Sequence, residues 1–168
     1  MTAVHVQSFA PVADARATRL ILGSMPSVAS LRANQYYAHP HNAFWRIMSN
    51  LVNVDPVAVY EERLRALQAA KIAVWDVLQS CERRGSLDAS IRRDSEVVND
   101  FDTFLAQHPH ITRILFNGSA AQTSFKRHCA ALLRNPNISF QRLPSTSPAH
   151  ASLRFEQKLT AWGSALHL

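Results

Sequence analysis

The sequence predicts an α/β fold in which a parallel sheet of four strands is covered by helices on both faces. Short apolar runs alternate four times with longer segments whose apolar residues recur at helical spacing, and no internal repeat or interdomain linker interrupts them. Alternation of this kind indicates a parallel sheet, because each connection must cross from one end of the sheet to the other. The length of 168 residues suits one domain. We expect that domain at residues 18–168, after a loosely attached arm at residues 1–17.

Four short runs rich in leucine, isoleucine, valine and phenylalanine are the predicted strands. They comprise residues 18–22, 72–77, 111–116 and 138–143. Turn-forming residues bound them, since Gly23 follows the first run and Asn117-Gly118 follows the third. The charged, glycine-containing segment 80–90 is expected to form a loop over the end of the sheet.

Five further segments are predicted helices. They comprise residues 43–50, 55–69, 99–107, 119–133 and 148–166. The first has apolar residues at helical spacing from Phe44 onward, and Asn42 occupies the position of its N-cap. The second begins with Asp55-Pro56, since aspartate caps helices and proline fits their first position.

The charge balance favours a polyanionic partner. Eighteen lysines and arginines exceed twelve aspartates and glutamates, which gives a net charge of +6 and a sequence pI near 10.0. Such a charge is common among proteins that bind nucleic acids, although many basic proteins bind no acidic partner. The apolar share of 47% is ordinary for a soluble globular protein.

The cysteines and the N-terminal residues point to the cytoplasm. Cys81 and Cys129 are too few for a disulfide framework and lack the spacing of a zinc site, so we expect reduced thiols. The first residues show no signal-peptide pattern, and no apolar run has the length needed to span a bilayer. We therefore expect a cytoplasmic protein with no membrane partner.

The segment from Gly23 to Trp45, GSMPSVASLRANQYYAHPHNAFW, is the strongest candidate for a binding site. It contains two adjacent tyrosines, two histidines and a Phe-Trp pair, but only one formally charged side chain, Arg32. A solvated linker would be more charged and less aromatic. The other candidate residues also follow predicted strands, and the carboxyl ends of parallel strands meet at the edge where ligands bind in open α/β sheets. The sequence therefore predicts a polar and aromatic pocket at that edge.

Several longer motifs resemble those of a known family. GSMPS followed by YYAHPHNAFW, then AVWDVLQSCERRGSLDASI, LFNGSAAQTSF and LPSTSPAHAS, occur in the order found in the uracil-DNA glycosylase superfamily. The chain is most similar to the hypoxanthine-DNA (deoxyinosine) glycosylase branch, and next to the mismatch-specific uracil/thymine glycosylases. The resemblance extends from about Leu20 to Trp162. It implies a three-layer α/β/α sandwich with a central four-stranded parallel sheet.

The resemblance implies hydrolysis of the bond between C1′ and the base of a nucleotide flipped out of the helix. Asn42 matches the asparagine of the family's NxFW motif and would orient the water or the sugar; helix capping is the alternative, and one residue can do both. The backbone amides of Ser24 and Met25 would bind the base carbonyl or the water. Mismatch-specific members carry an asparagine in the motif that begins here at Gly23. This chain has no amide there, a departure that the hypoxanthine branch shares.

Three residues would bind the base. Tyr37 aligns with the stacking aromatic of the family, and its neighbour Tyr36 is the rival for that role. Asp76 would accept a hydrogen bond from the lactam N–H that hypoxanthine and uracil share, with a helix or loop cap as the alternative. Asn117 would read the other edge of the base or bind a phosphate together with the next helix N-terminus.

The loop after the fourth strand would hold the DNA backbone and fill the gap left by the base. The residues that match this loop are Pro144, Ser145, Thr146 and Ser147. His150 stands where the most comparable members have asparagine. Leu143 replaces the histidine with which uracil-specific relatives stabilise the leaving pyrimidine, which points away from a uracil-only enzyme. Arginines are further candidates for phosphate contacts, namely Arg83, Arg84, Arg92, Arg93, Arg142 and Arg154.

The resemblance also limits the chemistry. A glycosylase that cuts the strand through a Schiff base needs a lysine in its site. The three lysines, Lys71, Lys126 and Lys158, lie outside the motif loops, so a monofunctional glycosylase without lyase activity is expected. We expect no cofactor and no metal, because His39, His41 and His150 lack the spacing of a zinc site and the family needs no metal.

The predicted function is excision of a deaminated base, first hypoxanthine from deoxyinosine, from double-stranded DNA. We expect a monomer in the cytoplasm that is nucleoid-associated when bound to DNA. A uracil or G:T/U mismatch glycosylase is the alternative within the family. A non-catalytic module that binds damaged DNA or nucleotides is the alternative of another class.

Overall fold

A four-stranded parallel sheet lies at the centre of the computed structural model, which describes residues 2–168; Met1 lies outside them. Its order is β3-β2-β6-β7, with β3 at Ile72–Asp76, β2 at Arg19–Gly23, β6 at Arg113–Asn117 and β7 at Ser139–Leu143. All four predicted strands are present, and each ends within two residues of its predicted limits. Because the strands are parallel, their carboxyl ends share one edge of the sheet.

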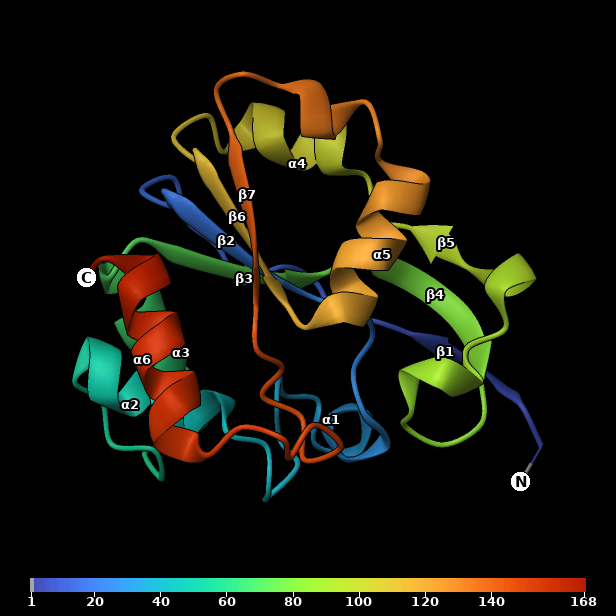
Figure 1. Cartoon of the computed structure of the whole chain (residues 1–168), viewed down its shortest axis with the longest axis horizontal. Helices are drawn as coiled ribbons and strands as arrows, with labels where there is room; N and C mark the ends of the chain where they lie inside the picture. Colours follow the sequence, from blue (N-terminus) through green and yellow to red (C-terminus); the bar gives the residue numbers. More distant parts are fainter. Residues whose placement is uncertain (1) are drawn as a thin grey trace.

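Helices cover both faces of this sheet, as predicted (Figure 1). Successive residues of β2 point to opposite faces: Leu20 and Leu22 pack with Phe125 in one core, whereas Ile21 packs with Trp162 in the other. The helices of the first core are α4 (Phe101–Gln107) and α5 (Ser119–His128). Those of the second are α2 (Phe44–Val52), α3 (Tyr60–Ala69) and α6 (Phe155–Leu166). The fold is the three-layer α/β/α sandwich that the sequence predicted.

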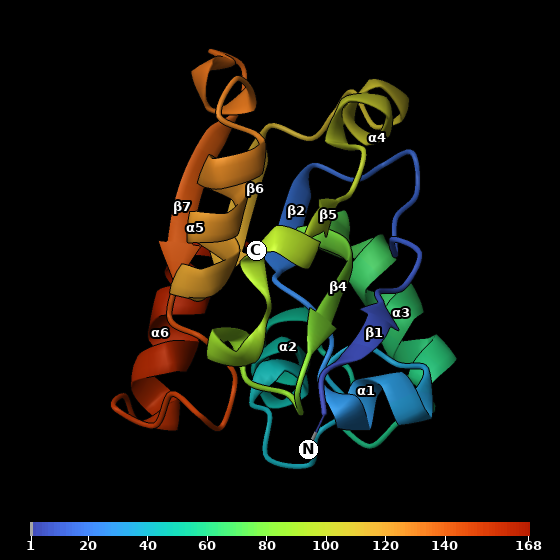
Figure 2. The ribbon, with the colours of Figure 1, turned by 90° about the vertical axis from the view of Figure 1, so that its right-hand side faces the viewer.

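A second, antiparallel sheet was not expected from the sequence. It joins β1 (Val4–Gln7), β4 (Leu78–Arg83) and β5 (Val97–Val98) in the order β1-β4-β5. β1 lies beside β4 along its whole length (Figure 2). Two expectations are therefore corrected: the described part of the arm at residues 1–17 is paired with the domain, and the expected loop at 80–90 begins as a strand.

Further contacts attach the N-terminal segment to the main sheet. Val12 and Val74 exchange two backbone hydrogen bonds of 2.9 Å, and the indole of Trp75 donates to the Phe9 carbonyl at 3.1 Å. The N-terminal segment makes these contacts through its backbone groups, which every sequence offers. Its irregular composition therefore gave no sign of them.

Helix starts differ from prediction where the chain makes a local turn instead. α3 begins at Tyr60 and not at residue 55, because the Asp55 carboxylate accepts from the Val57 amide at 2.9 Å and closes a turn. α6 begins at Phe155 and not at residue 148, with Arg154 at the N-cap. The preceding residues are left for the loop that follows β7.

Short helical segments complete the fold. α1 (Val28–Ala33), which was not predicted, starts at Ser27, whose hydroxyl accepts from the Ser30 amide at 3.1 Å. α5 ends at His128 and not at residue 133. The single turns of 3₁₀ helix are η1 (Asp88–Ser90), η2 (Arg93–Ser95) and η3 (Leu132–Arg134).

Candidate active site

A cavity of about 90 Å³, open to solvent, lies where the parallel strands end. Gly23, Asp76 and Asn117 are the last residues of β2, β3 and β6, and Ser145 follows the end of β7. Nine residues singled out from the sequence line the cavity: Ser24, Met25, Tyr37, Asn42, Asp76, Asn117, Ser145, Thr146 and Ser147. Three others, Pro144, His150 and Arg154, are not among its lining residues.

Gly23 allows two polar side chains to meet over the end of β2. A Cβ atom at this position would lie 2.6 Å from Asp76 Oδ1 and 3.1 Å from the Tyr37 hydroxyl, so a larger residue would displace the carboxyl group. Tyr37 has a left-handed backbone with φ of 56°, which is rare for a bulky residue. The loop turns sharply there, and the Tyr37 hydroxyl reaches the cavity floor beside Asp76.

The Asp76 carboxyl group is buried and unpaired. Asp76 is 3% exposed, and its Oδ2 atom has no hydrogen-bond partner in the described chain. Burial raises its pKa to about 7, the negative charge of Asp88 raises it as well, and the Arg83 guanidinium opposes both effects. The carboxyl group caps no backbone amide of residues 2–168; only the Asp76 carbonyl is held, by the Asn99 side chain at 2.8 Å.

The two adjacent tyrosines have different surroundings. Tyr36 is buried, donates from its hydroxyl to the Ala10 carbonyl at 2.9 Å and packs edge-on against Phe9. Tyr37 is half-buried and stacks on Phe44 with ring centres 4.1 Å apart. Burial and the neighbouring Asp76 raise the pKa of Tyr37 far above its ordinary value, so its hydroxyl stays protonated. Since Phe44 covers one face of the Tyr37 ring, only the opposite face remains for a base.

The N-cap of α2 is Ala43 and not Asn42 as expected, but the Asn42 side chain bonds to the first residue of the helix and also lines the cavity. Its Oδ1 accepts from the Phe44 amide at 2.9 Å, directly at the start of α2. Its Nδ2 donates to no acceptor of residues 2–168 while the side chain lines the cavity. Holding the Phe44 amide and reaching into the cavity are therefore compatible, because each uses a different end of the Asn42 amide.

Asn117 lines the cavity, and its side-chain amide bonds to Thr146. Oδ1 accepts from the Thr146 amide and Nδ2 donates to the Thr146 hydroxyl, each at 2.9 Å. The carbonyl of Thr146 in turn accepts from the Ala43 amide at 2.9 Å. Asn117 thus positions the loop after β7, and these bonds leave one N–H of Nδ2 and one lone pair of Oδ1 unused.

Ser86 and Asp88 are cavity residues to which sequence reasoning assigned no role. The Ser24 hydroxyl donates to Asp88 Oδ1 at 2.5 Å, and the Val28 amide donates to the Ser86 hydroxyl at 2.8 Å. The segment between β4 and η1 therefore docks on the loop that follows β2. The GSLD stretch within a family-like motif was the available signal, but its partners lie about sixty residues earlier in the chain.

The loop after β7 is held at both ends. The Pro144 carbonyl accepts from the Trp162 indole at 2.9 Å, and the His150 carbonyl accepts from the Lys158 ammonium at 2.7 Å. The His150 side chain is exposed and lines a neighbouring groove together with Lys158, whereas Arg154 is exposed at the start of α6. Ser145, Thr146 and Ser147 line the cavity from the middle of this loop.

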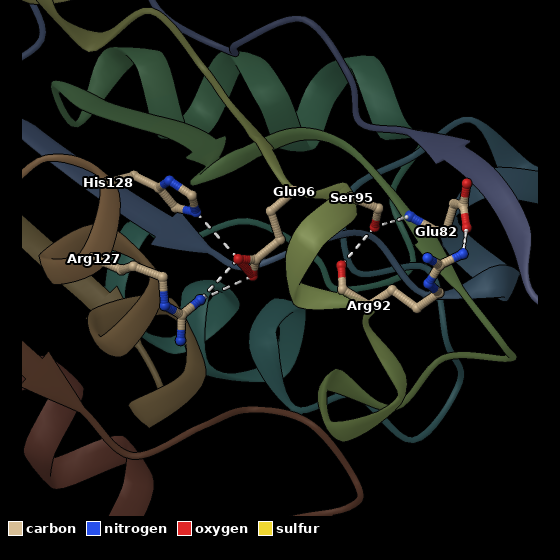
Figure 3. Close-up of polar contacts among 6 residues, drawn as sticks. All are labelled: Glu82, Arg92, Ser95, Glu96, Arg127 and His128. Carbon is tan, nitrogen blue, oxygen red and sulfur yellow. Dashed lines mark hydrogen bonds and ion pairs between the residues drawn. The ribbon is translucent and has the colours of Figure 1, made fainter.

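Two of the six arginines considered for phosphate contact are engaged elsewhere. Arg83 is fully buried and donates to the Pro26 carbonyl at 2.5 Å, so it cannot reach DNA. Arg92 is paired with Glu82 (Figure 3) and with Asp94. The remaining four are exposed, namely Arg84, Arg93, Arg142 and Arg154.

A second ion-pair group in Figure 3 fixes the segment that carries Asp88. The Glu96 carboxylate, whose side chain is 6% exposed, accepts from Arg127 Nη1 at 2.7 and 3.1 Å and lies 3.1 Å from His128 Nε2. Because Arg127 and His128 belong to α5, these contacts attach the end of the segment between β4 and β5 to that helix.

Residues 2–168 contain neither a metal-binding cluster nor a membrane-spanning helix. No group of three or more histidine, cysteine, aspartate or glutamate side chains is placed to hold a metal ion there. No helix in the same range has the length and apolar character that crossing a membrane requires. Cys81 and Cys129 are both free thiols.

The fold and the cavity together define an α/β protein with a polar and aromatic binding site at the carboxyl edge of its parallel sheet. The chain belongs to the uracil DNA glycosylase superfamily, whose family model matches residues 10–165.

Individual relatives cover most of the chain. A protein of Methanosarcina barkeri named hypoxanthine DNA glycosylase is 40% identical over 113 residues, or 67% of this chain and 70% of that protein. A protein of the same name from Methanosarcina acetivorans is 36% identical over 146 residues, which are 86% of this chain and 87% of that protein. The solution NMR structure of a candidate uracil DNA glycosylase from Methanosarcina acetivorans matches with a TM-score of 0.79 and 32% identity, over 98% of this chain and 100% of that one.

Proposed function

We propose that the protein is a DNA glycosylase that excises hypoxanthine from deoxyinosine. The observation that carries this proposal is the meeting of Asn42, Tyr37 and Asp76 in one cavity, beside the hydroxyl-rich loop after β7. Identity of 36% to 40% with two proteins named hypoxanthine DNA glycosylase supports this choice of substrate.

The cavity offers the groups that this hydrolysis needs. The reaction requires a nucleotide held outside the stack, a water on the far side of the sugar and an environment that stabilises the departing base. The face of Tyr37 that Phe44 does not cover can stack on the base, and the unpaired Nδ2 of Asn42 can orient the water or the sugar. Ser145 and Ser147 offer hydroxyls to the phosphates that flank the flipped nucleotide.

The proposed enzyme is monofunctional, so it leaves an abasic site and does not cut the strand. None of the three lysines lines the cavity. Lys158, which is nearest to the loop after β7 in sequence, donates its ammonium to the His150 carbonyl and borders a different groove. No lysine amine among residues 2–168 is therefore placed in the cavity to form a Schiff base with C1′.

The proposed substrate is double-stranded DNA, and the proposed enzyme acts as a cytoplasmic monomer. The net charge of +6 and the exposed arginines Arg84, Arg93, Arg142 and Arg154 would favour a DNA backbone. Binding should weaken as salt is raised, because each phosphate contact releases a counterion.

A strand-nicking assay tests the function directly. Labelled duplexes with one deoxyinosine, one uracil or one mismatched thymine would be incubated with the wild-type protein or with Asn42→Ala. Each reaction would then be divided into two portions, of which one is treated with hot alkali. We expect nicking of the inosine strand that requires alkali and is lost in Asn42→Ala.

Other outcomes assign other functions. Nicking without alkali would contradict the monofunctional proposal. Release of uracil or thymine alone would indicate a mismatch or uracil glycosylase. Binding of damaged duplex without release of any base would favour a non-catalytic module.

A further inference from the structure

The side chains that line the cavity include two carboxyl groups and no cation. Asp76 and Asp88 are the two acids, and none of the described lining residues is lysine, arginine or histidine. A leaving base that carried a full negative charge would therefore meet two acidic side chains and no cation among the lining residues. This charge pattern bears on how the base departs.

The surroundings of Asp76 favour its neutral form. The groups that face it are Asp88 from η1, Arg83 from β4, and the hydroxyls of Tyr36 and Tyr37 from the loop before α2. The Arg83 guanidinium donates to the Pro26 carbonyl and makes no bond with the carboxyl group, whose Oδ2 stays unpaired. Burying an unpaired carboxylate is so unfavourable that such a group holds its proton instead. Asp76 can therefore offer a proton inside the cavity.

A purine leaves C1′ readily when a ring nitrogen has taken up a proton, because the bond electrons then enter a neutral base. We propose that Asp76 is the general acid that protonates N7 of the departing hypoxanthine. This inference rests on the proposed function and goes beyond it by giving Asp76 a donor role, in place of the acceptor role expected from the sequence.

The proposed step balances without any further reactant. The bond between C1′ and N9 breaks and its electron pair goes to the purine, while the Asp76 proton moves to N7. The oxygen of water forms a bond to C1′, and the proton that the water loses passes to solvent. Solvent returns a proton to Asp76 after the base departs, so the net change is the addition of one water.

A two-by-two comparison of enzyme and substrate tests the step. Single-turnover release would be measured for wild type and Asp76→Asn, on duplexes with deoxyinosine or 7-deaza-deoxyinosine, which has no N7. Asparagine keeps the size and the hydrogen-bonding oxygen of aspartate but has no acidic proton. We expect Asp76→Asn to slow release of hypoxanthine by at least about 100-fold, the usual contribution of a general acid. We expect 7-deaza-deoxyinosine to be comparably slow with wild type, and Asp76→Asn to slow it little further.

The pattern of losses decides the outcome. Equal slowing of both substrates by Asp76→Asn, or slowing of neither, would overturn the inference, because coupled losses are the sign that the two changes remove one interaction. Unchanged binding of a duplex with the cleavage-resistant 2′-fluoroarabino analogue of deoxyinosine would show that the variant is folded. Absence of hypoxanthine release by wild type would refute the proposed function instead.

The pH profile gives an independent reading, even where release of the deaza base is too slow to follow. The wild-type rate on deoxyinosine should decline above about pH 7, where the buried acid ionises, and the Asp76→Asn rate should not. Asp88→Asn should move the decline to lower pH, because loss of the neighbouring negative charge lets Asp76 ionise more easily. A wild-type rate that stays level through this range would overturn the inference.

Discussion

Asn117 holds Thr146 by both ends of its side-chain amide, at 2.9 Å in each case. Thr146 is 1% exposed, and its carbonyl accepts from the Ala43 amide at the start of α2. The end of β6, the loop after β7 and the first turn of α2 therefore form one hydrogen-bonded unit around the cavity.

Replacing Asn117 tests this unit. Asn117→Ala leaves the amide and hydroxyl of buried Thr146 without partners, so we expect a loss of ~1–3 kcal/mol in the free energy of unfolding and weaker excision. Asn117→Asp is the control, since a carboxylate can accept from both Thr146 groups. Urea denaturation and single-turnover kinetics would measure the two effects. Equal stability of wild type and Asn117→Ala would contradict the positioning role.

The two ends of the Asn42 amide can be separated by substitution. Asn42→Asp keeps the oxygen that caps the Phe44 amide and removes the Nδ2 donor, so stability should stay near that of wild type while excision falls. Asn42→Ala should in addition lose about 1 kcal/mol of stability, the usual net value of one hydrogen bond, because the Phe44 amide loses its side-chain acceptor. Thermal or urea unfolding beside an excision assay distinguishes them. Full activity of Asn42→Asp would assign Asn42 to capping alone.

Gly23 should tolerate no side chain. The Cβ of Gly23→Ala would lie 2.6 Å from Asp76 Oδ1, so the carboxyl group must move; we expect a cost of ~1–3 kcal/mol in stability and a large loss of excision. Gly163→Ala is the matched control within α6, where the new Cβ would meet only Leu51 at 3.3 Å and alanine favours the helix. Urea unfolding and an excision assay on both variants would show whether the losses are specific to Gly23→Ala. An active Gly23→Ala would mean that the carboxyl position is not critical.

The stability contribution of Asp76 should depend on pH. Its pKa is about 7 in the folded protein, whereas an aspartate in an unfolded chain titrates near ~3.9. Between these values the folded state retains a proton that the unfolded state has lost, so the folded state loses stability as pH rises. Asparagine does not titrate, so Asp76→Asn lacks this loss. The unfolding free energy of the variant minus that of wild type should therefore rise by ~2–4 kcal/mol between pH 4 and pH 8.

Urea unfolding at several pH values would measure this change, and Asp100→Asn provides a control. The Thr103 hydroxyl and amide donate to the exposed Asp100 carboxylate and lower its pKa. The stability of Asp100→Asn relative to wild type should therefore not increase as pH rises. A difference between Asp76→Asn and wild type that stays constant with pH would mean that Asp76 is ionised in the folded protein.

The two ion-pair groups of Figure 3 should differ in importance. Glu96 is nearly buried beside Arg127, so Glu96→Gln should cost ~1–3 kcal/mol and raise hydrogen exchange in the segment that carries Asp88. Glu82→Gln breaks a pair whose side chains are 40% and 55% exposed, and should cost at most ~1 kcal/mol. Equal effects of the two substitutions would show that the Glu96 contact does not hold the segment.

The sequence was sufficient to predict the central sheet but not the second one. Three of the parallel strands, β2, β3 and β6, contain continuous apolar runs, which burial on both faces demands, whereas the edge strand β7 is mostly polar and exposed. β1 has mostly exposed residues and β5 has only two residues, so neither carries a pattern of its own. Their pairing depends on the position of β4, which a linear pattern does not contain.

The site residues were predictable by position and not by bonding. Asp76 and Asn117 were found because each follows an apolar run. Which atoms remain available depends on partners far along the chain: Thr146 lies 29 residues after Asn117, and Asp88 lies 64 residues after Ser24. Such distances are set by the packing of the whole domain.

The bond from the Trp162 indole to the Pro144 carbonyl gives the protein an optical reporter of its own. The chain has three tryptophans, and the other two, Trp45 and Trp75, donate to carbonyls away from this loop. Because indole emission responds to the loss or gain of a hydrogen bond, a chain with Trp45→Phe and Trp75→Phe would fluoresce from Trp162 alone. Its emission would follow the seating of the loop on DNA in real time, without any attached dye.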